Sequence, residues 1–275
     1  MVGFTYVTDM EELTYITIVI PLRIDSEERR ANLDTALGYL CRYPEIKIIL
    51  LEADNEPLYK SRMNHPNVSY IFIEDKDPIF YRTRYINRML HEVRTPVAGI
   101  WDSDVIVPVE QIAEAVNRCV ADYTLCYPFD GRFYAAHKCL SRLYKYTGNM
   151  DILVQNQSLH WLMHGWYSVG GAFAVNTEKY LSAGGENENM YGWGPEDTER
   201  RERICNLGLK IGRVAGCLYH LSHPRGINSD FASYERAIAN RGEYMKICRM
   251  NRNELEKYIT TWNWSIKHIH HETKN

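Results

Sequence analysis

Alternating strand-like and helix-like segments are the feature that most constrains the fold of this chain. The strand-like runs, rich in Ile, Val and Leu, are "YITIVIPL" (15–22), "IKIILLEA" (46–53), "VSYIFI" (68–73) and "PVAGIW" (96–101). Apolar residues recur at helical spacing at about 33–41, 80–94 and 112–120. Because parallel strands need crossover connections of this kind, the pattern predicts an α/β fold with a mostly parallel central sheet flanked by helices on both faces.

The alternation of strand-like and helix-like segments becomes less regular after about residue 123. The expected elements are an aromatic, helix-like segment that runs to about residue 148, a strand at "VGGAFAV" (169–175), a helix from 195 to near Gly208, and a strand region at 209–221. The last fifty residues look helical, with Phe231, Tyr234 and Ile238 spaced as one face. No repeat or linker is visible, which favours one domain with a helical C-terminal tail.

Composition argues against several classes of protein. Hydrophobic residues make up 45% of the 275 residues, enough for a sizeable core, and the net charge of −3 gives no reason to expect nucleic-acid binding. The seven cysteines form no CxxC pair, which favours a reducing compartment over a disulfide framework. The apolar run near the N-terminus is too short for a signal peptide or a membrane span. We therefore expect a cytoplasmic protein, with peripheral contact at the inner face of the membrane left open.

Two aspartates directly follow the strand "PVAGIW". In open α/β sheets, ligands bind beyond the carboxyl ends of the strands, and alternate residues of an extended segment point the same way. Asp102 and Asp104 can therefore face one point, where two carboxylates suit Mg²⁺ or Mn²⁺ bound to a diphosphate. The alternative is a solvated loop that caps a helix, but the position at the end of a central strand favours the metal site.

The segment "GWGPEDTER" (192–200) places an acidic pair at the start of a predicted helix. Pro195 suits the first helical position, which puts Glu196 and Asp197 in the first turn, where the helix dipole favours anions. One alternative is that the pair only stabilises the helix, by about 0.3–1 kcal/mol for each residue. The flanking glycines, however, allow the loop to approach a sugar closely, and Trp193 offers the sugar a ring face.

The motifs "IPLR", "IFYRTRYIN", "DSD", "VGGAFAV" and "GWGPEDTER" occur in this order over about residues 15–226. With them the chain resembles glycosyltransferases of the GT-A fold, the nucleotide-diphospho-sugar transferase fold. It is most similar to the galactosyltransferase C-terminal-region group, which includes animal β-1,4-galactosyltransferases and bacterial polysaccharide and glycolipid enzymes. The resemblance implies a GT-A catalytic domain over residues 1–226, with a nucleotide-binding part at about 1–107 and an acceptor-binding part at about 108–226. Residues 227–275 would form a helical extension packed on it.

The resemblance also implies that a UDP-sugar donor binds at the strand ends. Pro21, Leu22 and Arg23 match the first-strand motif of the family and would border the uridine. Phe80 and Arg82 match a segment near the nucleotide, where Arg82 and Arg84 could bind the diphosphate. The other implied donor contacts are an acidic residue at the uracil, either Glu52 or Asp54, and Asp102, Gly170 and Gly171 at the donor sugar or ribose.

A metal site is implied by the same resemblance, formed by one aspartate and the histidines of "CLYHLSHPRG". In the animal relatives a methionine and a histidine stand at the positions of His220 and His223. Asp104 is the expected direct ligand, and Mn²⁺ or Mg²⁺ the expected ion. His160 and His164 have the spacing of a zinc pair but lack the HExxH glutamate, so we expect them to be acceptor-loop or core residues.

In the family's chemistry, Asp197 would be the general base that deprotonates the acceptor hydroxyl, while Glu196, Trp193 and Gly194 would bind the acceptor. The expected function is metal-dependent, inverting transfer of a hexose, galactose or an N-acetylhexosamine, from a UDP-sugar to a carbohydrate or glycolipid acceptor. The resemblance suggests a role in bacterial surface polysaccharide or glycolipid synthesis. Three alternatives remain open: a retaining transferase of the same fold, a metal-dependent hydrolase, and a non-catalytic sugar- or nucleotide-binding module.

Overall fold

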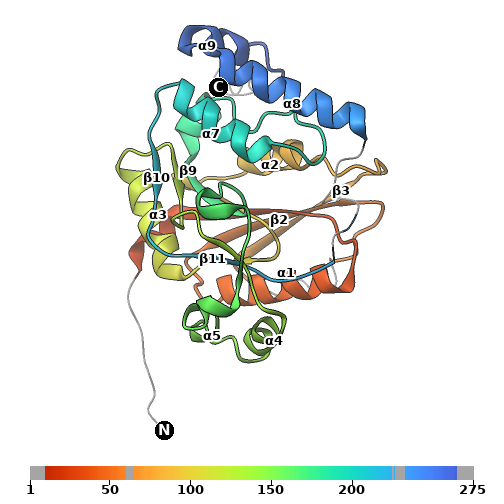
Figure 1. Cartoon of the computed structure of the whole chain (residues 1–275), viewed down its shortest axis with the longest axis vertical. Helices are drawn as coiled ribbons and strands as arrows, with labels where there is room; N and C mark the ends of the chain where they lie inside the picture. Colours follow the sequence, from red (N-terminus) through yellow and green to blue (C-terminus); the bar gives the residue numbers. More distant parts are fainter. Residues whose placement is uncertain (1–9, 60–64, 225, 227–232, 265–275) are drawn as a thin grey trace.

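A seven-stranded mixed sheet forms the centre of the molecule (Figure 1). The computed structural model describes residues 10–59, 65–224, 226 and 233–264. Strand β9 runs antiparallel to both of its neighbours, whereas the other four strand pairs are parallel, so the predicted mostly parallel sheet is confirmed. In spatial order the strands are β10 (Ile211–Arg213), β6 (Leu125–Tyr127), β9 (Ala172–Asn176), β4 (Val97–Trp101), β1 (Ile16–Leu22), β2 (Lys47–Asp54) and β3 (Val68–Glu74).

A second, four-stranded sheet lies beside the first. Its strands, in spatial order, are β5 (Val105–Ile106), β11 (Leu218–His220), β7 (Phe133–Ala135) and β8 (Trp161–Leu162). The predicted strand region at 209–221 is therefore two strands in different sheets, β10 and β11. The chain turns between them at Gly216, whose φ of +116° is a conformation that side-chain-bearing residues rarely adopt.

Helices cover both faces of the large sheet. Figure 1 shows α1 and α2 on opposite sides of β2, and all seven residues of β1 are buried, as expected for a strand with covered faces. The helices are α1 (Glu27–Leu40), α2 (Arg82–Leu90), α3 (Val109–Ala121), α4 (Lys138–Thr147), α5 (Asp151–Val154), α6 (Thr177–Ser182), α7 (Glu196–Asn206), α8 (Tyr234–Arg249) and α9 (Arg252–Ile259). Short 3₁₀ helices span Glu11–Tyr15, Gln157–Leu159 and Gly165–Tyr167. Within the described ranges, no helix combines the length and apolarity that crossing a bilayer requires.

Two expectations about helices were wrong in detail. The aromatic segment before residue 148 is helical only in α4, because β6 and β7 precede it. In α8, the proposed face is solvent-exposed: Tyr234 and Ile238 are 77% and 51% exposed, and Phe231 lies outside the described residues. The helix packs instead through Ala237, Asn240 and Ile247, a face that includes a polar residue and so escapes a search for apolar spacing.

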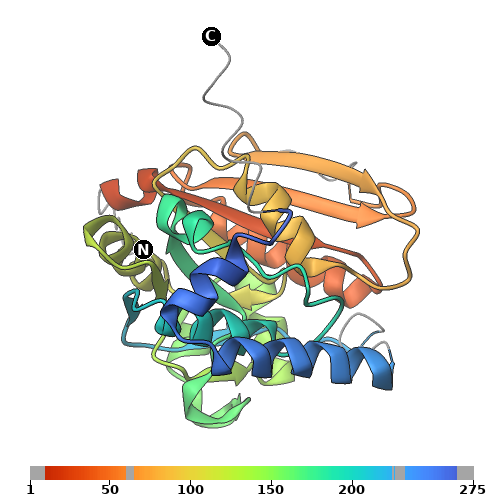
Figure 2. The same ribbon diagram turned by 90° about the horizontal axis from the view of Figure 1, so that it is seen from above.

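The C-terminal helices α8 and α9 pack against α7 (Figures 1 and 2), at the end of the molecule remote from α4 and α5 (Figure 1). On α7, the Asn206 side-chain amide donates to the Ile247 carbonyl at 3.0 Å and to the Met250 carbonyl at 3.4 Å. Beyond α9, the Trp264 indole donates to the Gly184 carbonyl at 3.1 Å. Helix α7, whose first turn carries the predicted acidic pair, is therefore held at its C-terminal end by the C-terminal part of the chain.

Candidate active site

A cavity of about 620 Å³ lies where residues of both sheets meet the N-terminal end of α7. This is the carboxyl-terminal edge of β1 and β4, where ligands of open α/β sheets bind. Nearly all the predicted site residues line it: Pro21, Arg23, Phe80, Arg82, Asp102, Asp104, Gly170, Gly171, Trp193, Gly194, Glu196, Asp197, His220 and His223. Residues predicted from motifs far apart in the sequence are thus brought to one place.

Asp104, His220 and His223 form a cluster that could hold a metal ion. One ligand atom from each residue can be chosen so that all lie within 4.8 Å of one another. Asp104 Oδ2 is 2.9 Å from His223 Nε2, and Asp104 Oδ1 is 3.5 Å from His220 Nε2. Two imidazole nitrogens and one carboxylate suit a divalent transition-metal ion such as Mn²⁺.

The charges within this cluster favour an ionised Asp104. Burial alone would disfavour the charged carboxylate, but His220 and His223 outweigh it and lower the pKa of Asp104. Burial likewise opposes protonation of His220, yet the Asp104 charge prevails and raises the pKa of His220. Asp104 is therefore held in its ionised form, the form in which a carboxylate binds a metal ion.

Asp102 has a different partner from Asp104. Its Oδ1 accepts a hydrogen bond from Arg82 Nη2 at 2.7 Å, while burial raises the pKa of its carboxyl group in spite of that pairing. The other terminal nitrogen, Arg82 Nη1, is buried and has no hydrogen-bond partner among the residues that the structure describes. An unpaired buried guanidinium nitrogen is costly, so its position at the cavity indicates a site for an anionic group.

The acidic pair occupies the first turn of α7 as predicted, with Pro195 as the residue that precedes the helix rather than its first residue. Asp197 Oδ1 accepts a hydrogen bond from Arg200 Nη1 at 2.8 Å. Its other oxygen, Oδ2, lies beside Gly170, where an added Cβ would come within 2.5 Å of it. Oδ1 of Asp197 is therefore fixed by Arg200 of α7, whereas Oδ2 lies beside Gly170 in the cavity wall.

Glu196 lies deeper than Asp197, with 7% of its surface exposed against 34% for the Asp197 side chain. Its Oε2 accepts a hydrogen bond from the Gly194 backbone amide at 2.9 Å. Burial, together with the negative charge of Asp197, raises the pKa of Glu196 to about 8. A neutral Glu196 can donate a hydrogen bond to a ligand, which a carboxylate cannot do.

Other predicted residues lie outside the cavity lining. Leu22 is buried in the core, and the Glu52 carboxylate accepts bonds from the Tyr59 amide, at 3.1–3.2 Å, and from the Tyr70 hydroxyl. Asp54 Oδ1 accepts a bond from the neighbouring Asn55 amide at 2.8 Å. The exposed Arg84 lies over the Tyr81 ring, 5.9 Å from its centroid.

Of the two histidines in the 156–167 loop, expected to be acceptor-loop or core residues, one lies in the core and the other lines the cavity. His160 is buried, and its Nδ1 accepts a hydrogen bond from the His137 amide at 3.0 Å. His164 lines the cavity.

Several lining residues were not predicted, among them Arg29 and Tyr167. Arg29 Nη1 is 3.9 Å from Asp104 Oδ2 and lies in the first turn of α1, which begins at the same sheet edge as the aspartates. Its place after a strand followed by the helix cap Ser26 was a usable signal. Tyr167 reaches the cavity only through the path of the 156–167 loop, which carries no periodic pattern.

Over part of its length, the chain is similar in sequence to galactosyltransferases. A family described as the N-terminal domain of galactosyltransferase matches residues 151–224. Beta-1,4-galactosyltransferase 7 of Mus musculus and that of Homo sapiens are each 30% identical over 111 residues, 38% of this chain and 33% of theirs. The match thus spans about a third of the length of these relatives.

Two solved structures share the fold over most of the chain. GalNAc-T7 with UDP, GalNAc and Mn²⁺ has a TM-score of 0.58 at 15% identity, covering 89% of this chain and 50% of its own. The catalytic domain of Drosophila beta1,4galactosyltransferase 7 in complex with xylobiose has a TM-score of 0.50 at 16% identity, covering 86% and 82%. At these identities the likeness concerns the fold.

Proposed function

Since the chain has a galactosyltransferase-like GT-A fold, as its motifs predicted, we propose that it is a glycosyltransferase. It transfers a hexose from a UDP-sugar to a hydroxyl group of a carbohydrate acceptor, with a divalent metal ion. The observation that carries this proposal is the convergence on one cavity of a metal-ligand cluster, an anion site at Arg82 and the acidic pair of α7.

On the donor side, Asp104, His220 and His223 would hold the metal ion, with Mn²⁺ as the expected ion. A bound divalent ion supplies positive charge that offsets the charge developing on a leaving diphosphate. Arg82, through its unpartnered Nη1, would bind a diphosphate oxygen, and Asp102 would keep the guanidinium in place. Pro21, Arg23 and Phe80 would border the nucleotide.

On the acceptor side, Asp197 would act as the general base through Oδ2, while Arg200 holds Oδ1. Neutral Glu196 would donate a hydrogen bond to the acceptor, and Trp193 would stack on it. Attack by the deprotonated hydroxyl on the anomeric carbon inverts its configuration, and UDP departs. General-base catalysis of this kind contributes about 10²–10⁴-fold to the rate.

The acidic pair favours transfer over the metal-dependent hydrolase, because a hydrolase needs no acceptor site beside its metal ligands. A complete metal-ligand cluster likewise favours an enzyme over a binding module. A glycolipid or surface polysaccharide of bacteria as the acceptor, and a cytoplasmic site of action at the inner membrane face, are further parts of the proposal. They rest on the resemblance of the sequence motifs.

The decisive experiment measures release of UDP from a panel of UDP-sugars, with Mn²⁺ or with chelator, for wild type and Asp104→Ala. Slow hydrolysis of the donor needs no acceptor, so the unknown acceptor does not interfere. We expect metal-dependent release from one sugar, lost in the variant. No release from any sugar, together with no thermal shift on adding UDP and Mn²⁺, would refute the proposal in favour of the binding module.

A further inference from the structure

Helix α8 contacts the loop that carries Trp193, although α8 lies beyond the region of sequence resemblance. We call residues 191–194 (Tyr191, Gly192, Trp193 and Gly194) the tryptophan loop. Asn240 of α8 is 1% exposed, and its amide Nδ2 donates to the Tyr191 carbonyl at 3.1 Å and to the Trp193 carbonyl at 3.3 Å. A single side chain thus bridges two carbonyls on either side of Gly192.

The fit between Asn240 and the loop depends on Gly194. A Cβ at Gly194 would lie 2.7 Å from Asn240 Nδ2 and 3.1 Å from Asn240 Cβ, so only glycine allows this approach. Gly192 has φ +74°, a conformation open to glycine at little cost. Because glycines flank Trp193 on both sides, the loop backbone has little stiffness of its own and depends on outside contacts for its position.

A second contact from α8 acts on the same loop. The Arg236 guanidinium lies over the Tyr191 ring, 4.6 Å from its centroid. The Tyr191 hydroxyl in turn donates to the carboxylate of Asp77, which lies in the segment after β3. Tyr191 is thereby held between α8 and the segment after β3.

We propose that Asn240 is a positioning residue that fixes the tryptophan loop, so that α8 belongs to the acceptor site of this protein. Asn240 does not line the cavity; it acts through the carbonyls of Tyr191 and Trp193. With the loop fixed, Trp193 and the Gly194 amide, which binds Glu196, keep their places at the cavity. This inference rests on the proposed function only where it assigns the loop to the acceptor.

The test uses the full chain and three variants, two at Asn240 and one control. Asn240→Asp keeps the shape of the side chain but turns the donor into an acceptor that faces two carbonyls, and Asn240→Ala removes the donor without adding charge. The matched control is Asn206→Asp, because Asn206 also donates to two carbonyls across the α7–α8 contact but lies away from the loop. Hydrogen–deuterium exchange of the peptides that cover 187–197 reports loop opening without any need for an acceptor.

We expect exchange of the tryptophan-loop amides to rise about tenfold in both Asn240 variants, because each variant removes the donor that binds two loop carbonyls. In Asn206→Asp, faster exchange should be confined to the ends of α7 and α8. Acrylamide quenching of Trp193, isolated by difference from Trp193→Phe, should rise only in the Asn240 variants. The dissociation constant for UDP with Mn²⁺ should stay within about twofold of wild type in every variant that keeps Trp193.

The positioning role would be overturned if the tryptophan-loop amides of the Asn240 variants exchange at the wild-type rate. It would also be overturned if exchange of these amides rises equally in Asn206→Asp. Absence of UDP binding in wild type would instead refute the proposed function and leave the exchange result to decide on Asn240. If Asn240→Asp fails to fold, Asn240→Ala supplies the same comparison with the control.

Discussion

Glu196 is the residue at which pH should affect stability most clearly. Burial and the Asp197 charge raise its pKa to about 8, although Arg82 and Arg200 act in the opposite direction. An acid whose pKa rises on folding stabilises the folded state below its unfolded pKa, near 4.5, and this contribution is lost as pH rises towards 8. Glu196→Gln mimics the neutral form, so its stability relative to wild type should increase across this window.

Thermal or urea unfolding at about pH 5 and about pH 8.5 measures the difference in free energy of unfolding between Glu196→Gln and wild type. We expect this difference to grow by at least about 1.4 kcal/mol between the two pH values, the equivalent of one pKa unit. Glu178→Gln is the matched control, since Glu178 also lies in the first turn of a helix, α6, but is exposed. If stability relative to wild type changes with pH equally in both variants, or in neither variant, the pKa of Glu196 is not raised.

Gly170 should be required for the position of Asp197. An alanine Cβ at this site would lie 2.5 Å from Asp197 Oδ2, so the carboxylate would have to move. Displacement of a catalytic group by about 1 Å can cost about 10²-fold in rate. We expect Gly170→Ala to lower the rate of sugar transfer by about that factor. Gly38→Ala, where the Cβ meets nothing within 4 Å, controls for the substitution itself, and equal activities of the two variants would count against the assigned base.

The ligand set at Asp104 should select between metal ions. Two imidazoles and one carboxylate are a better match for Mn²⁺ than for Mg²⁺, which prefers oxygen ligands and retains water. We expect Mn²⁺ to support donor hydrolysis at concentrations at least about tenfold lower than Mg²⁺ does. His220→Asp replaces an imidazole ligand with an oxygen ligand, so the preference for Mn²⁺ over Mg²⁺ should become smaller. If this preference is unchanged in the variant, His220 is not a metal ligand.

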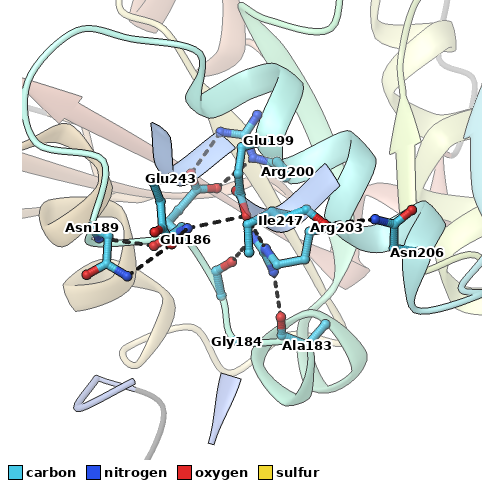
Figure 3. Close-up of polar contacts among 12 residues, drawn as sticks. Ala183, Gly184, Glu186, Asn189, Glu199, Arg200, Arg203, Asn206, Glu243 and Ile247 are labelled. Atoms are coloured by element: carbon cyan, nitrogen blue, oxygen red, sulfur yellow. Dashed lines mark hydrogen bonds and ion pairs between the residues drawn. The ribbon is translucent and has the colours of Figure 1, made fainter. Parts of the chain in front are cut away.

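At the scale of elements, α7 is held by buried ion pairs rather than by an apolar face (Figure 3). Arg200 is fully buried and makes two hydrogen bonds of 2.8 Å to Glu186, and Arg203 bonds Glu199 at 2.9 Å. Removing one partner of a buried pair leaves an uncompensated charge, which costs about 3–5 kcal/mol. These contacts place Arg200 next to Asp197 and so orient the acidic pair.

Arg200→Met should therefore destabilise the protein by about 3–5 kcal/mol in urea unfolding, and Glu186→Gln in the same chain should restore most of the loss. Arg252→Met, which breaks the exposed pair with Glu256, should cost less than about 1 kcal/mol. A double variant no more stable than Arg200→Met would show that the loss arises from packing against Phe173, whose ring centroid is 4.0 Å from Arg200.

The sequence was most informative about elements built on apolar periodicity. Strands β1, β2 and β4 and helix α3 lie within a few residues of their predicted places, because burial of Ile, Val and Leu decides their position. The sequence located helix α8, but the prediction of its buried face was wrong. Asn240 lies on that face and binds backbone carbonyls, so it does not follow the apolar pattern. Side-chain-to-backbone contacts of this kind have no period in the sequence.

At the scale of the whole molecule, the cavity unites parts of the chain that only the fold brings together. The motifs "DSD" and "GWGPED" predicted Asp104 and the acidic pair, since each stands where an element begins or ends. Arg29, in the first turn of α1, could have been predicted in the same way, but Tyr167 and the contribution of α8 could not. Their places depend on the pairing of β8 with β7 and on the packing of α8 against α7, which join segments distant in the sequence.

The arrangement of the whole cavity predicts the stereochemical outcome of the reaction. The candidate metal-ligand cluster lies at β11 and the loop after β4, whereas Asp197 lies on α7, so the proposed base and leaving group would be held by separate parts of the molecule. Arg200 donates a hydrogen bond to Asp197 and is itself held by its buried partner Glu186, so the Asp197 carboxylate is fixed in place. A fixed base suits a single displacement, in which the hydroxyl is deprotonated as UDP leaves.

We therefore expect an α-linked UDP-sugar to yield a β-linked product, which the anomeric proton coupling in NMR distinguishes from an α-linked one. Asp197→Asn should lower transfer by about 10²–10⁴-fold while leaving metal-dependent binding of UDP intact, because it removes the base but no donor contact. An α-linked product, formed at a rate that Asp197→Asn barely changes, would assign this cavity to a retaining transferase and leave Asp197 with a purely structural role on α7.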